Sequence, residues 1–193
     1  MGILGKLKEL FSARRYINRV MEEMDRRNEA YAAMSAEELF ALSDDDLCSA
    51  VLYRIDKIIG ATLGKPSLAD PAEAILLLGD TQKTVYALAC WESELAGGGL
   101  CKFLTGGCGA LLPCITAMLE RVEAIEHREL LCEFAAAHEM DLLKPSPLSA
   151  VNEFEYAEQR ERLPFDTFDR SYRRLPSLEG FIVSYIRANI SEF

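Results

Sequence analysis

The sequence has no long hydrophobic run, and this absence limits where the protein is expected to act. No apolar stretch approaches the roughly 20 residues that a membrane-spanning helix requires. The N-terminal segment carries Lys6, Lys8 and Glu9 where the apolar part of a secretory signal peptide would lie. We therefore expect a cytoplasmic protein with no membrane partner.

Recognisable metal and cofactor motifs are also missing. The six cysteines include no Cys-x-x-Cys pair, and the spacing of Cys101, Cys108 and Cys114 matches no zinc template. The glycine clusters at 97–99 and 106–109 do not continue into Gly-Lys-Ser or Gly-Lys-Thr, as a phosphate-binding loop would. The sequence thus predicts no metal and no cofactor, and it favours reduced cysteines that fill space in the core.

Histidine is scarce, which leaves little material for acid–base catalysis. The two histidines, His127 and His138, have no Ser or Cys nucleophile at a recognisable spacing. We predict no catalytic residue and expect that the protein is not an enzyme. A hydrolase built around Glu94 and a histidine is kept as the third-ranked alternative.

Negative charge is what the sequence has in excess, with a net charge of −10. Residues 31–143 contain 18 acidic and 7 basic side chains, a balance of −11, whereas residues 1–30 have a balance of +2. An acidic body repels the phosphates of nucleic acids. We therefore expect no direct binding to DNA or RNA.

Apolar residues recur at helical spacing along nearly the whole chain, most clearly in residues 111–125. No alternating pattern of convincing length predicts a strand. The fold class is therefore all-α. We expect a single compact multi-helix domain over 35–193 and an additional N-terminal amphipathic helix over 1–34. Ser35 and Glu38 have the capping-box spacing that would begin the domain.

A helical pattern is interrupted at Gly97, Gly98 and Gly99 and restarts immediately afterwards. Three glycines beside apolar residues predict a structural turn in which the backbone adopts positive φ. We expect the helix to stop at Gly97. We also expect Gly98→Val to be destabilising through backbone strain.

Two groups of acidic side chains are candidates for contacts with a partner. One is the run Asp44, Asp45 and Asp46, which also suits the first turn of a helix. The other group has helical spacing and consists of Glu120, Glu123 and Glu126. A role as ordinary solvent-exposed charge would account for either group.

The glycine turn also carries a family resemblance. The pattern Glu-x-x-Asn-Gly-Gly-Phe-x-Gln, followed by an aromatic residue, resembles the run from Glu94 to Phe103. The segments FDTFDRSYRR (165–174) and FIVSYIRA (181–188) are similar to the C-terminal end of the same family. On these motifs the chain resembles the DNA mimic protein nineteen-like family, a group of bacterial helical domains, over roughly residues 36–190.

The chain matches the family pattern at Glu94, Gly98 and Gly99. It departs from the pattern at three positions, where Gly97 replaces Asn, Leu100 replaces Phe and Lys102 replaces Gln. Glycine can still supply an unusual backbone conformation, and leucine can still fill an apolar position. The resemblance therefore implies the family's helical fold, whereas a function of the missing amides would be lost.

The resemblance also implies a function, in which carboxylates on a helical surface take the place of DNA phosphates. The expected partner is then a basic protein, such as a DNA-binding regulator, and a homodimer is left open. The main alternative is a protein-interaction or immunity-type helical module that uses an apolar groove near Gly97–Gly99.

Overall fold

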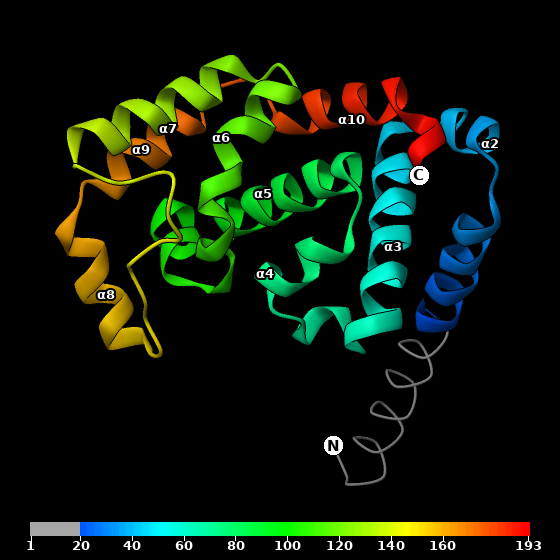
Figure 1. Ribbon diagram of the computed structural model, residues 1–193, viewed down its shortest axis with the longest axis horizontal. Coiled ribbons are helices and arrows are strands. Elements are labelled where there is room, and N and C mark those ends of the chain that lie inside the picture. The colour runs from blue at the N-terminus through cyan, green and yellow to red at the C-terminus, as the bar shows by residue number, and fades with distance from the viewer. Residues whose placement is uncertain (1–19) are drawn as a thin grey trace, which may run out of the picture. The chain divides into compact units, whose positions relative to one another are not determined.

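The computed structural model describes residues 20–193, and every regular element in that part of the chain is helical (Figure 1). The prediction of an all-α fold is therefore confirmed. The chain forms two compact units, with the boundary between Arg54 and Ile55. Most of the predicted N-terminal extension, residues 1–19, lies outside the described residues, and a helix covers residues 20–33.

The first unit is organised by polar contacts at helix starts. It contains the helix at 20–33, α2 (Ala36–Phe40) and the first part of α3 (Asp44–Leu63). The side chain of Ser35 accepts a hydrogen bond from the Glu38 amide, and Glu38 accepts one from the Ser35 amide, so the predicted capping box is confirmed.

The second unit holds the remaining elements, which are one long helix, α5, and shorter helices connected by loops. In chain order after α3 they are η1 (Pro66–Leu68), α4 (Pro71–Ala74), η2 (Ile75–Leu77), α5 (Asp80–Thr105), η3 (Gly107–Leu111), α6 (Leu112–Arg121), α7 (Ile125–Ala137), α8 (Glu153–Arg162), α9 (Phe165–Tyr172), α10 (Leu178–Ala188) and η4 (Ile190–Glu192). Among the residues described, no single helix is both long and apolar enough to cross a membrane.

Helix α5 is the centre of this unit and contacts η3, α6, α8, α9 and α10 (Figure 1). The indole ring of Trp91 is completely buried and lies 4.7 Å from the ring of Phe103 and 6.4 Å from that of Phe168, measured between centroids. Buried aromatic rings in edge-to-face contact contribute both apolar area and a preferred orientation. They fix how α9 lies on α5.

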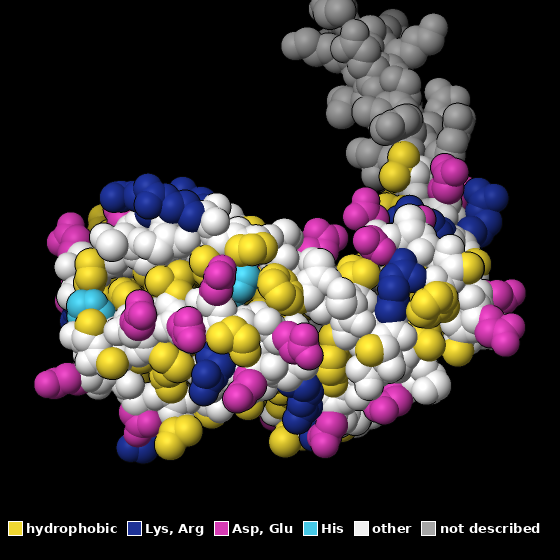
Figure 2. Space-filling view, turned by 90° about the horizontal axis from the view of Figure 1, so that it is seen from above, with side chains coloured by type: hydrophobic (Ala, Val, Ile, Leu, Met, Phe, Trp, Pro, Cys, Tyr) yellow, Lys and Arg dark blue, Asp and Glu magenta, His cyan; other side chains and the backbone are white. Residues whose placement is uncertain are grey.

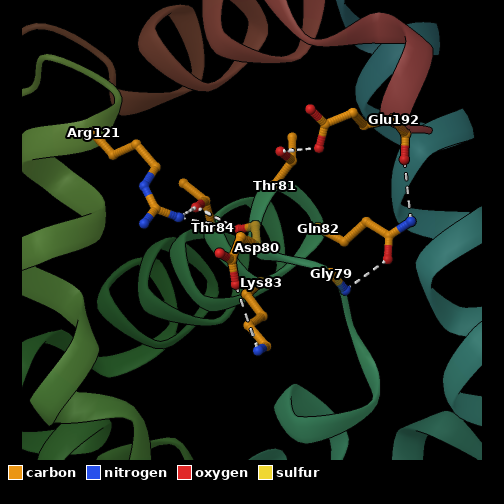
Figure 3. A network of polar contacts seen from close by, with 8 residues as sticks. All are labelled: Gly79, Asp80, Thr81, Gln82, Lys83, Thr84, Arg121 and Glu192. Carbon is orange, nitrogen blue, oxygen red and sulfur yellow. Dashed lines mark hydrogen bonds and ion pairs between the residues drawn. The ribbon is translucent and has the colours of Figure 1, made fainter.

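Polar contacts tie the start of α5 to two later elements (Figure 3). Arg121, at the end of α6, donates to the Asp80 carbonyl and to the Thr84 hydroxyl. At the C-terminus, Glu192 accepts a hydrogen bond from Thr81 at 2.5 Å through its carboxylate. The first turn of α5 thus anchors both α6 and η4.

Helix α5 bends at one residue only. Gly99 has φ 77° and ψ −172°, whereas Gly97 and Gly98 keep helical angles. The prediction that the helix stops at Gly97 is therefore wrong. The prediction that Gly98→Val is strained by positive φ is also wrong, because positive φ occurs at Gly99 and not at Gly98. The special conformation belongs to Gly99, because the contact that requires it comes from α9, far away in the sequence.

Candidate functional site, a cleft at the glycine turn

The bend in α5 is held by Asp169 of α9. The Leu100 amide donates to Asp169 Oδ1 at 2.9 Å, which satisfies an amide that the bend removes from the helical pattern. A Cβ atom built on Gly99 would lie 2.0 Å from Asp169 Oδ2. Gly99 is therefore required twice, by its positive φ and by the close approach of the carboxylate.

Lys102 covers the other side of the turn. A Cβ on Gly98 would lie 2.7 Å from Lys102 Cδ, and one on Gly97 would lie 2.7 Å from Lys102 Nζ. The ammonium group reaches Glu94 Oε2 at 3.2 Å. Glu94 and Lys102 are thus a structural pair that encloses the first two glycines, which gives the matched Glu94 position a physical role.

A cleft of about 720 Å³ opens in front of the turn, between α5, α9 and the segment that leads into α10. Its size suits a small molecule or a long side chain. The predicted apolar groove near Gly97–Gly99 is thus a cleft of mixed character, with apolar and charged side chains together. Its lining residues include Glu92, Leu95, Arg160, Asp169, Tyr172, Arg173 and Leu178.

A chain of hydrogen bonds forms one wall of the cleft. Trp91 Nε1 donates to the Tyr172 hydroxyl at 2.9 Å, and this hydroxyl donates to Glu92 Oε1. Burial raises the pKa of Glu92, the hydrogen bond from Tyr172 lowers it, and the charge of Glu179 raises it. Burial also raises the pKa of Tyr172, which therefore keeps its proton and remains a donor.

Asp169 is the most enclosed carboxyl group of the cleft, with 6% of the residue exposed. Burial raises its pKa, whereas the Leu100 amide and the charges of Arg173 and Arg160 lower it. Arg160 itself is paired with Asp166 at 2.5 Å. The cleft thus contains two carboxyl groups, of Glu92 and Asp169, whose negative charge is disfavoured by burial.

The candidate residues Asp44, Asp45 and Asp46 all lie in the first turn of α3. Asp46 accepts hydrogen bonds from the Tyr31 and Ser43 hydroxyls, both at 2.8 Å. These bonds lower its pKa. Asp46 therefore has a structural role at the start of α3.

The candidate residues Glu120, Glu123 and Glu126 are exposed around the turn between α6 and α7. Glu120 lies 3.7 Å from Arg128, and Glu123 occupies the turn with φ 63°. On the face shown in Figure 2, acidic side chains are scattered among apolar and neutral ones, and basic side chains form one cluster at an edge and also lie between the acidic ones. The structure brings these three glutamates together in one unit, while Asp44–Asp46 belong to the other.

His127 and Glu94 have separate surroundings. His127 is 1% exposed, and its ring lies 5.2 Å from that of Tyr172 and 5.8 Å from that of Phe181. Glu94 instead contacts Lys102 and lies 4.0 Å from the Cys108 sulfur. Among the described residues, no group of three or more His, Cys, Asp or Glu side chains is arranged to hold a metal ion.

Sequence analysis missed the three residues that give the cleft its chemistry, Glu92, Asp169 and Tyr172. Asp169 and Tyr172 lie in the segment 165–174, whose sequence indicates only the family resemblance. Their separation of three residues places them on one helix face, and this was the available signal. No feature of the neighbouring sequence indicates that this helix face contacts the glycine turn.

Comparison with known proteins gives a match to a family model. The sequence model of the family described as DMP19-like protein matches residues 77–189, which is more than half of the chain and includes both the glycine turn and α9. No curated protein and no solved structure matches the chain. The chain belongs to the DMP19-like protein family.

Proposed function

We propose that this protein acts by binding, and that exposed glutamates on α6 and α7 engage a basic protein partner in place of DNA. The surface concerned, called here the α6–α7 acidic face, consists of Glu120, Glu123, Glu126, Glu129 and Glu133, all of them exposed. The observation that carries the proposal is the regular series of carboxylates along α7.

The spacing along α7 is compatible with imitation of a phosphate backbone. Glu126, Glu129 and Glu133 are three and four residues apart, so they share one helix face. With a rise of about 1.5 Å per residue, successive carboxylates are about 4.5 and 6 Å apart along the helix axis. One DNA strand carries a phosphate about every 3.4 Å along its axis, which is a similar density of charge.

Nearby cations leave most of this charge available. Arg128 pairs with Glu120, and Arg121 donates to the Asp80 carbonyl and the Thr84 hydroxyl. Within the described part of the chain, no ion pair involves the other four glutamates of the face. A basic surface would thus meet uncompensated carboxylates, which favours fast and salt-dependent association.

The test uses host proteins that elute from immobilised DNA, passed over the immobilised full-length protein. We expect at least one of them to bind, to be displaced by duplex DNA, and to elute as salt rises because screening shortens the range of the attraction. The triple variant Glu126→Lys, Glu129→Lys, Glu133→Lys should lose this binding.

A matched control reverses three exposed glutamates elsewhere, with Glu73→Lys, Glu153→Lys and Glu161→Lys. This variant has the same change in net charge and should keep the bound protein. Binding that survives the α7 reversals, or that is insensitive to both DNA and salt, would contradict mimicry by the α6–α7 acidic face.

A further inference from the structure

We propose that the cleft at the glycine turn is a binding site for a cationic group, an ammonium or a guanidinium, held between Glu92 and Asp169. This site is separate from the α6–α7 acidic face, and the proposal does not depend on that surface. The argument rests on unused acceptor atoms, on the direction of α5 and on the positions of the basic residues.

Each of the two carboxyl groups uses one oxygen and leaves the other without a donor. Glu92 Oε1 accepts from Tyr172, and Asp169 Oδ1 accepts from the Leu100 amide. In the described part of the chain, Glu92 Oε2 and Asp169 Oδ2 accept no hydrogen bond, and only 6% of the Asp169 residue is exposed. A carboxylate in a partly buried position is stabilised by further donors. A ligand that supplies a cation with N–H donors would satisfy both oxygens.

The cleft has further negative character from the main chain. The first part of α5 ends at Gly98, directly beside the cleft, and the last carbonyl groups of a helix carry partial negative charge. Tyr156 donates to the Gly98 carbonyl at 2.9 Å, so one of these groups has a partner. The backbone of Gly97, Gly98 and Gly99 lines the cleft.

The two arginines of the lining lower the pKa of Asp169 through their charges but form no ion pair with it. Arg160 is paired with Asp166, outside the cleft lining, and no ion pair within the described residues joins Arg173 to Glu92 or Asp169. Arg173 is exposed, so it lies in contact with solvent. An anion entering the cleft would face both carboxyl groups, whereas a cation would meet them favourably. The pKa of Glu92, raised by burial, agrees with a carboxyl group that has no cation beside it.

The first test is calorimetric titration of the full-length protein with agmatine and cadaverine, and with glutarate as an anionic control. We expect both cations to bind and glutarate not to bind. Glu92→Gln and Asp169→Asn keep an oxygen for Tyr172 and for the Leu100 amide, so each should preserve the fold. Each variant should weaken agmatine binding at least tenfold, whereas Glu73→Gln, on the exposed surface of α4, should leave it unchanged.

A second measurement needs no variant. Amide resonances of Gly97, Gly98 and Gly99 should shift during titration of the wild-type protein with agmatine, because the ligand lies against this backbone. The proposal would be overturned if neither cation binds at about 10 mM or if glutarate binds in preference to them. It would also be overturned if the resonance shifts are confined to other residues.

The same cation could come from a free amine or from a side chain of a protein. A capped tripeptide, acetyl-Gly-Arg-Gly-amide, separates the two sources. Tighter binding of the tripeptide than of agmatine supports a cleft that receives an arginine side chain, and tighter binding of agmatine supports a small-molecule site. Binding of neither contradicts the proposal. Loss of partner binding to the α6–α7 acidic face would leave all these outcomes unchanged.

Discussion

Gly99 shows how one residue can join two helices. A side chain there would be strained by positive φ and would also meet Asp169 Oδ2 at 2.0 Å. We expect Gly99→Ala to lower the free energy of unfolding by more than the roughly 1–3 kcal/mol of backbone strain alone. Urea unfolding monitored by circular dichroism measures the change.

Two other glycines separate these contributions. Gly64 has φ +82° and no atom within 4 Å of a built Cβ, so Gly64→Ala should show strain without a clash. Gly180 lies within α10 with equally open surroundings, and Gly180→Ala should stabilise the protein by about 0.5–1 kcal/mol. If Gly99→Ala and Gly64→Ala lower the free energy of unfolding equally, the close approach of Asp169 does not restrict the residue at position 99.

His127 should make stability depend on pH. Burial lowers its pKa, while the Pro176 carbonyl and the charge of Glu126 raise it. Below about pH 6.5 the unfolded chain gains a proton at this residue that the folded protein binds less readily. Stability from neutral His127 is thus present above that pH and is lost as the pH falls.

His127→Phe keeps an aromatic ring between Tyr172 and Phe181 and removes the titrating group. Between pH 7.5 and 5, the wild type should lose stability relative to the variant by at most about 1.4 kcal/mol per pH unit, the slope for one proton. Parallel curves of unfolding free energy against pH for the two proteins would contradict a lowered pKa.

At the scale of elements, the C-terminal helix η4 depends on the first turn of α5. Thr81 is 6% exposed and donates to Glu192, and Gln82 donates to the Glu192 carbonyl at 3.2 Å (Figure 3). Glu192→Ala leaves the Thr81 hydroxyl without its acceptor, which should cost about 1–3 kcal/mol. Glu192→Gln retains an oxygen and should cost less.

Hydrogen exchange can localise this effect. Amides of α10 and η4 should exchange faster in Glu192→Ala, and amides of α7 should keep their wild-type protection. Equal protection of η4 in the wild type and in Glu192→Ala would mean that apolar packing alone holds the C-terminus.

Helix starts could be predicted from the sequence because a capping box depends on four consecutive residues, as at Ser35 and Glu38. The bend in α5 could be predicted only approximately. Three adjacent glycines are locally equivalent, and the choice of Gly99 depends on Asp169, which is 70 residues further along the chain. The cleft carboxyl groups were missed for the same reason, since tertiary contacts bring them together.

At the scale of the whole molecule, the all-α fold was predictable because helical periodicity is repeated in nearly every segment. The charge balance of residues 31–143 was also visible, but composition does not show which carboxylates are already engaged. Asp46 bonds to Tyr31 and Ser43, whereas Glu129 and Glu133 extend the exposed series on α7. Only the structure distinguishes these roles.

The thiols of the whole chain give a last prediction. All six cysteines are unpaired, and the thiols of Cys90 and Cys108 interact with each other. The interaction with Cys90 lowers the pKa of Cys108, while burial raises the pKa of Cys101 and Cys114. Because the thiolate is the reactive form, iodoacetamide should modify Cys108 before Cys101 and Cys114 in the native protein.

After unfolding without reductant, thiol titration should count all six cysteines, and elemental analysis should find no stoichiometric zinc. A count lower by two, with the loss mapped to Cys90 and Cys108 by mass spectrometry, would show that this neighbouring pair forms a disulfide. Preferential labelling of Cys101 would instead contradict the order of pKa values, because that thiol is buried. Thiol titration and iodoacetamide labelling both use the full-length chain, so they report the state of the thiols in the whole protein.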